Sequence, residues 1–184
     1  GGAIGKSAQF PLNEWLLEAM TGPTAVSALI HAATMVKAGV FLVARLGPLV
    51  FALAAAGILA DQFFEIIAWV GAITALLLAT QGMVNPEIKK VLAYSTGSQI
   101  GYMMMALGVA GLSTQYVDGY TAGFFHLISH AMFKASLFMA AGSLLHVVGS
   151  RFMTDMGGLR KQMKKTYAFM WAAGLALMGA PFIT

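Results

Sequence analysis

Residues 120–148 read YTAGFFHLISHAMFKASLFMAAGSLLHVV, an apolar run interrupted by a few polar side chains. A bilayer core of roughly 30 Å requires about 20 mostly apolar residues in a helix, so this run is long enough to span a membrane. His126, His130 and Lys134 lie four residues apart within it. Because residues four apart stack on one helix face, the run predicts a membrane helix with a single titratable stripe about three turns long.

The composition of the whole chain agrees with a membrane assignment. Of its 184 residues, 59% are hydrophobic and only 10% are charged, whereas soluble domains carry about 25% charged residues. The net charge is +4, but the sequence contains no module typical of nucleic-acid binding. The absence of cysteine excludes thiolate catalysis, iron–sulfur clusters and zinc–thiolate sites. We therefore expect no nucleic-acid partner, and neither a metal nor a cofactor bound by this chain.

Four apolar stretches have the length of a complete span. They cover about residues 23–46, 62–84, 90–112 and 120–148, and a fifth stretch begins near Tyr167. Pro86 ends the second stretch, because proline cannot extend a helix. The sequence thus predicts an all-α integral membrane protein built as a multi-span helical bundle.

Two further segments do not fit a plain span. Residues 1–20 hold the end of an earlier helix, an interruption at Pro11 and a short amphipathic piece around Trp15. Broken helices in membranes occur where the backbone lines a cavity or is buried in protein. Residues 48–60 are apolar but too short to span, so we expect either an extension of the first span or a re-entrant segment.

The charges of the loops indicate the topology. The loop after the second span and the loop after the fourth span are basic, whereas the loop between them carries only Asp118. The basic residues are Lys89, Lys90, Arg151, Arg160, Lys161, Lys164 and Lys165. Cytoplasmic loops are enriched in lysine and arginine, so both basic loops are predicted to be cytoplasmic. We also expect a longer polypeptide, because the chain starts without methionine and stops within an apolar run.

Lysine and histidine within the spans are the candidate functional residues. A charged group at the bilayer centre costs at least about 2.5–3.5 kcal/mol on insertion, so it rarely faces lipid. Burial disfavours the charged form of lysine, and histidine titrates near neutral pH, so small field changes can load or release a proton. The stripe of His126, His130 and Lys134 is therefore predicted to relay protons. In the structural alternative, the histidines bond neighbouring helices and Lys134 pairs with an acid.

Four other residues are weaker candidates. His31 and Lys37 lie six residues apart in the first span, which puts them on different faces of a straight helix with different partners. His31 alone fits a structural role as well as a relay. Lys6 lies before the break at Pro11 and is either a proton site or a lysine that reaches the membrane surface. Lys89 lies at a predicted cytoplasmic helix end, where basic residues are common, so the topology alone can explain a lysine at this position.

The third span begins with an unusually polar segment. Tyr94, Ser98 and Tyr102 are spaced by four, and Ser95 and Gln99 stand beside them. These side chains either line a hydrated path or hydrogen-bond across helices, as small polar residues do in membrane bundles.

Several short motifs cover almost the whole chain. They are GKSAQFPL at 5–12, AMTGPT at 19–24, SALIHAATM at 27–35, IK at 88–89, VLAYST at 91–96, SQIGYM at 98–103, the stripe at 126–134 and MGGLR at 156–160. In combination they resemble the antiporter-like membrane subunits of respiratory complex I. The resemblance is closest to the large distal subunit, chain 5 or L, a group that includes archaeal deazaflavin-dependent relatives and Mrp-type sodium/proton antiporters.

The resemblance implies a role for individual residues. Lys6 would be the lysine on the discontinuous helix that ends the first half-channel, and His31 would pass its proton onward. The implied proton-transfer residues are Lys6, His31, Lys89, His126, His130 and Lys134, with Lys37 as a further candidate. Lys37 departs from some members of the group, which carry a small residue there.

The resemblance also implies an architecture, a fold of two inverted repeats with discontinuous helices. This chain would be a single transmembrane domain fragment, with the end of the first repeat at about 1–46 and most of the second at about 62–184. The fragment would sit in a multi-pass protein of a prokaryotic inner membrane.

Three functions follow from these expectations. The favoured one is a proton-translocating subunit of a redox-driven NADH- or deazaflavin:quinone-type oxidoreductase. FMN or deazaflavin, Fe–S clusters and quinone would then reside in partner subunits, with no redox chemistry in this chain. Its partners would be other antiporter-like and small membrane subunits, membrane lipid, and protons or Na+. The alternatives are an Mrp-type cation/proton antiporter subunit and a structural scaffold of a membrane arm.

Overall fold

The computed structural model describes residues 1–57 and 61–180, which form helices joined by short loops. The end of the apolar segment predicted at 48–60 and the last four residues of the fifth stretch lie outside the described residues. Within the described part no strand occurs, and Glu87 forms one isolated bridge with Phe152. The all-α prediction is confirmed.

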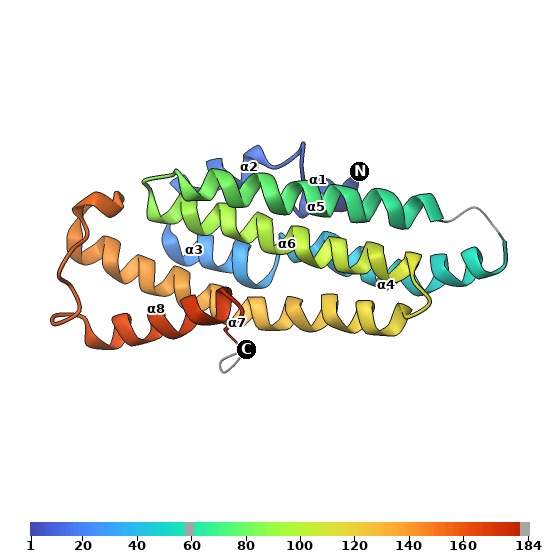
Figure 1. Ribbon diagram of the computed structural model, residues 1–184. Helices are drawn as coiled ribbons and strands as arrows, with labels where there is room; N and C mark the ends of the chain where they lie inside the picture. Colours follow the sequence, from blue (N-terminus) through green and yellow to red (C-terminus); the bar gives the residue numbers. More distant parts are fainter. Residues whose placement is uncertain (58–60, 181–184) are drawn as a thin grey trace.

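The long helices occur where the hydrophobic pattern predicts them. They are α5 (Asp61–Met83), α6 (Ile88–Leu112) and α7 (Tyr116–Val148), followed by the shorter α8 (Lys164–Leu177). Each begins within four residues of the predicted start. The helices lie lengthwise in one bundle, with α5 against α6, α6 against α7, and α8 along α7 (Figure 1).

Three segments are long and apolar enough to cross a membrane: Thr24–Ala55, Asp61–Met83 and Tyr116–Val148. α6 has a similar length, with 25 residues, but is more polar and does not meet that standard of hydropathy. It lies between α5 and α7 and contacts both, so much of its surface meets protein. Its position inside the bundle explains why a helix of this length can carry so many polar side chains.

The first predicted span, 23–46, is present but is not one continuous helix. α3 (Thr24–Ala28) continues into η2 (Leu29–Ala33), a π-helical turn, and the chain leaves the helix at 34–36. α4 (Lys37–Ala55) then resumes. The expectation of a straight helix here was wrong, because a π turn changes the face that later residues present. α4 runs through Pro48, so up to Ala55 the apolar segment is an extension of the span.

A second break in the helical structure lies before the first span, at the position that the sequence predicted from Pro11. α1 (Gly2–Lys6) is followed by an irregular segment, then by α2 (Glu14–Glu18) and η1 (Ala19–Thr21). Ser7 in that segment donates a 2.7 Å hydrogen bond to the carbonyl of Val36 in the other break. Gly39 allows the close approach of the two segments, because a Cβ there would lie 2.2 Å from the Ala3 oxygen.

The segment from α3 to α4 runs antiparallel to α7 over its whole length. The contacts that show this are Thr24 with Gly142, His31 with Phe138, Lys37 with Leu127, and Phe51 with Tyr116. Residues later in one segment contact residues earlier in the other. This alignment places the polar residues of the broken helix opposite the stripe on α7.

Candidate functional site

The predicted stripe on α7 faces the interior of the bundle. His130 and Lys134 are fully buried, and His126 is half-buried. The ring centroids of His126 and His130 lie 6.3 Å apart. The helical spacing therefore brings the three residues into one row, as the sequence predicted.

Lys134 is held by α6. Its Nζ donates a hydrogen bond of 2.5 Å to the Ser95 Oγ and one of 3.1 Å to the Leu92 carbonyl. Among residues 1–57 and 61–180, no carboxylate lies within ion-pair distance of this amine. The ammonium is therefore held by neutral oxygens, and the acid partner of the structural alternative is not found in the described residues.

His126 also contacts α6. Its Nε2 lies 2.5 Å from the Gln99 Oε1, which makes a hydrogen bond between the two side chains. Ser98 donates to the Ala75 carbonyl of α5 at 2.9 Å. The polar start of the third span thus hydrogen-bonds across helices. Tyr102 is 48% exposed and is not part of this arrangement.

Lys37 and His31 both reach α7. The Lys37 Nζ donates a 3.0 Å hydrogen bond to the Leu127 carbonyl, and the His31 ring lies 5.0 Å from the Phe138 ring. Their partners differ, as predicted, but belong to the same helix. Lys37 is 4% exposed and His31 is fully buried.

His31 and His130 lack hydrogen-bond partners within the described part of the protein. Both ring nitrogens of His31 and both of His130 are buried and unpaired there. The His130 ring lies 6.3 Å from the His126 ring and 5.2 Å from the Phe133 ring, measured between centroids. Buried polar groups nearly always have a partner, in protein or in water. His31 and His130 are therefore the two side chains of the row that call for a partner from outside the described residues, in protein or in water.

Lys89 is buried, although topology alone accounted for it in the sequence. Its Nζ donates to the carbonyls of Met20 at 2.8 Å and Gly22 at 2.7 Å, just before α3. The neighbouring Lys90 is instead partly exposed and pairs with Glu87 at 2.7 Å. Lys89 thus fixes the loop that leads into the broken helix.

Lys6 is the candidate that the structure does not bring into the row, since its side chain is exposed at the end of α1. Phe138 was missed, although it lies four residues after Lys134 and so continues the stripe. The carbonyls of Leu127, Met20 and Gly22 were also missed, because no sequence pattern marks a backbone acceptor for a distant lysine. In the described residues, no group of three His, Asp or Glu side chains could hold a metal ion.

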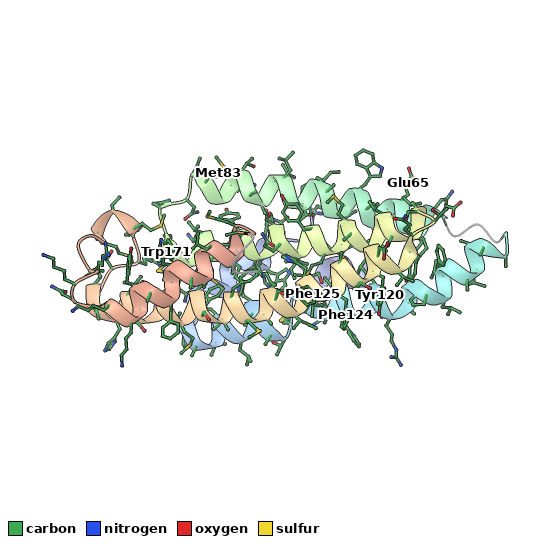
Figure 2. All side chains as sticks on the ribbon, turned by 60° about the horizontal axis from the view of Figure 1, so that its bottom comes forward. Glu65, Met83, Tyr120, Phe124, Phe125 and Trp171 are labelled. Carbon is green, nitrogen blue, oxygen red and sulfur yellow. The ribbon has the colours of Figure 1, made fainter. Side chains whose placement is uncertain are left out.

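The row joins residues from four parts of the chain. Lys37 and His126 lie near one end, His130 and Lys134 follow along α7, and His31 and Lys89 lie near the other end. Figure 2 labels Tyr120, Phe124 and Phe125 on α7. Tyr120 and Phe124 are partly buried and pack against the core, whereas Phe125 is exposed and lies off the buried stripe.

The chain is similar in sequence to several known proteins. Relatives include the F(420)H(2) dehydrogenase subunit L of Methanosarcina mazei, 50% identical over 97% of this chain and 25% of the relative. The NADH-ubiquinone oxidoreductase chain 5 of Arabidopsis thaliana is 47% identical over the whole chain and 25% of the relative. The chain therefore spans about a quarter of the length of these relatives.

Two solved structures share the fold. In the archaeal membrane-bound sulfane sulfur reductase, the match has a TM-score of 0.83 and 26% identity over 98% of this chain and 35% of that chain. In the Mrp complex from Dietzia sp. DQ12-45-1b, it has a TM-score of 0.76 and 33% identity over 96% of this chain and 20% of that chain. The family model described as NADH:quinone oxidoreductase/Mrp antiporter, TM, matches residues 1–184. The chain is thus an integral membrane protein that belongs to the NADH:quinone oxidoreductase/Mrp antiporter transmembrane family.

Proposed function

We propose that this chain is part of a proton-translocating subunit of a redox-driven NADH- or deazaflavin:quinone-type oxidoreductase. The observation that carries the proposal is a pair of fully buried histidines, His31 and His130, whose ring nitrogens have no partner within the described residues and which lie in one row with buried lysines. A purely structural core would be expected to satisfy those nitrogens with protein atoms. Nitrogens that lack protein partners can instead exchange protons with water.

The row contains lysines that can hold a proton and histidines that can transfer one. Lys37 and Lys134 are held only by neutral oxygens in the described part of the chain, so no fixed carboxylate locks them in the charged state. Neutral imidazole accepts a proton on one ring nitrogen and releases one from the other. His130 therefore suits transfer between Lys134 and the His126 end of the row. His31 would extend the row toward Lys89.

The relatives favour the redox-driven form of this function. Those described above are named as subunits of a dehydrogenase and of a quinone oxidoreductase, at 50% and 47% identity, against 33% for the Mrp structure. In this proposal the chain contributes to the translocase part of the enzyme. FMN or deazaflavin, Fe–S clusters and quinone belong to partner subunits, and the neighbours are other antiporter-like and small membrane subunits.

Further parts of the proposal concern location and organisation. The protein resides in a prokaryotic inner membrane, with 1–46 ending one inverted repeat and 62–184 forming most of the next. Lys6 remains a proposed proton site beside the break, and its exposed side chain would face a part of the protein outside this chain. The transported ion is H+ in the favoured form, with Na+ as the alternative cation.

The proposal is tested by Lys134→Met in the full-length subunit within its intact complex. Proton uptake into inverted membrane vesicles is measured during electron transfer from NADH or reduced deazaflavin. Loss of a positioned proton-transfer group is expected to reduce proton uptake by about tenfold or more, with assembly retained. Lys90→Met is the matched control, because Lys90 lies one residue from the buried Lys89 yet is partly exposed and paired with Glu87.

Two outcomes contradict the proposal. If both variants pump as the wild type does while the complex stays assembled, the helices act as a scaffold. If proton movement follows an imposed Na+ gradient without any electron donor, the Mrp-type antiporter is the correct function. In that case the same residues would work without a redox partner.

A further inference from the structure

The pairing of His126 with Gln99 is held in place by the packing of α6 on α7. Both helices begin and end in loops that the structure describes, and they lie side by side (Figure 1). On one side of the pair, a Cβ at Gly123 would lie 3.4 Å from the Met103 backbone oxygen, so the helices approach closely there. On the other side, Lys134 donates hydrogen bonds to two oxygens of α6. The two rings of contact leave the pair little freedom to separate.

This pairing determines which ring nitrogen of His126 carries the hydrogen. A neutral imidazole has one N–H group that donates and one bare nitrogen that accepts. The Gln99 Oε1, which lies 2.5 Å from the His126 Nε2, is a carbonyl oxygen and can only accept. Nε2 must therefore donate, and the hydrogen bond selects the tautomer with hydrogen on Nε2. Nδ1 is left as the nitrogen that accepts a proton.

The same hydrogen bond limits what His126 can do with a proton. A proton that binds at Nδ1 gives an imidazolium, and the ring passes charge onward only if Nε2 then releases its own proton. That proton faces an amide oxygen, and an amide is not among the side-chain groups that titrate in proteins. The imidazolium therefore returns the proton from Nδ1. His130 differs, because both its ring nitrogens are buried and have no partner within the described residues.

We propose that Gln99 is a positioning residue that holds His126 in the Nε2–H tautomer and confines its proton exchange to Nδ1. The inference rests on the proposed proton translocation and adds a gate to it. His130 can pass a proton through its ring, whereas His126 can do so only after Gln99 has moved away from Nε2. While Gln99 is in place, the pair thus limits the leak of protons through this end of the row.

The tautomer is tested by NMR spectroscopy of the intact complex with nitrogen-15 in the histidine rings. The His126 signals are those that disappear in the variant His126→Gln. We expect a protonated Nε2 and a bare Nδ1 in the wild type. Gln99→Leu removes the acceptor from a side chain of similar size and should raise the Nδ1–H fraction several-fold. Gln115→Leu is the matched control, because Gln115 is exposed at the start of α7 and should leave the signals unchanged.

The gate is tested with Gln99→Glu. A carboxylate keeps the hydrogen bond to Nε2 but can also accept its proton, so protons could then cross the His126 ring. A proton gradient is formed in vesicles by electron transfer, and its decay is followed after the electron donor is exhausted. We expect several-fold faster decay than in the wild type. Gln115→Glu adds the same charge at an exposed position and should leave the decay rate unchanged.

Three results would overturn the inference. A protonated Nδ1 in the wild type would mean that Gln99 turns its amide nitrogen toward the ring. An unchanged tautomer in Gln99→Leu would mean that Gln99 does not select it. An unchanged decay rate in assembled Gln99→Glu complex would mean that the amide is not a gate. The proposed function fails by a different measurement, proton uptake in Lys134→Met, and the wild-type tautomer can be read whatever that result is.

Discussion

Lys37 donates a 3.0 Å hydrogen bond from its Nζ to the carbonyl oxygen of Leu127, the residue that follows His126. This contact links the broken helix to the titratable stripe on α7. It depends on the break at 34–36, because six residues of straight helix would point Lys37 and His31 in different directions. The break thus lets one segment contribute two buried ionisable residues to the same row.

Lys37→Met is expected to impair proton translocation. The variant keeps an apolar side chain of similar length but removes the amine that lies at the His126 end of the row. Proton uptake by the intact complex should fall about tenfold, as for loss of a positioned proton-transfer group. Arg45→Met is the control, since Arg45 lies on the exposed face of the same helix. Equal proton uptake by both variants would remove Lys37 from the path.

Ser95→Ala should produce a milder defect than Lys134→Met. It removes one of two hydrogen bonds to the Lys134 amine and leaves the Leu92 carbonyl in place. A hydrogen bond to a charged group contributes about 1.5–3 kcal/mol, so the position of the amine loosens without loss of the group. Pumping rates of the two variants are compared in the same vesicle assay. An alanine variant as inactive as Lys134→Met would show that the hydroxyl itself carries protons.

Lys89→Met should destabilise the protein more than Lys90→Met. Without the Lys89 amine, the carbonyls of Met20 and Gly22 lose a buried donor, which costs about 1–3 kcal/mol. The Lys90 pair with Glu87 is partly exposed, and such pairs contribute about 0–1 kcal/mol. Thermal inactivation of the purified complex measures the difference. Matching inactivation temperatures would mean that Lys89 does not fix the loop before α3.

Gly101→Val should prevent stable packing of α5 on α6. A Cβ at Gly101 would lie 2.6 Å from the Gly71 oxygen and 2.8 Å from the Ala75 nitrogen, both of them backbone atoms. Overpacking of this kind costs about 1–3 kcal/mol or more. We expect the amount of subunit in the membrane, measured by immunoblot, to fall sharply. Gly174→Ala should leave that amount unchanged, and a normal level of the valine variant would disprove such close packing.

The sequence determined the helices and part of the site through local spacing. Apolar length fixed α5, α6 and α7 within a few residues, and intervals of four placed His126, His130 and Lys134 on one face. These features depend on the geometry of a single helix, which residue spacing specifies directly. The break at Pro11 was also predictable, because proline removes a backbone donor.

Tertiary structure decided the rest of the site. No nearby residue signals the π turn at His31, and the break that follows it packs against the first break through Ser7 and Gly39. Whether Lys89 is buried and Lys6 exposed depends on which carbonyls and helices lie opposite them, and these contacts are distant in the chain. Local spacing fixes the face of a helix on which a side chain lies, whereas only packing between helices fixes what that face meets.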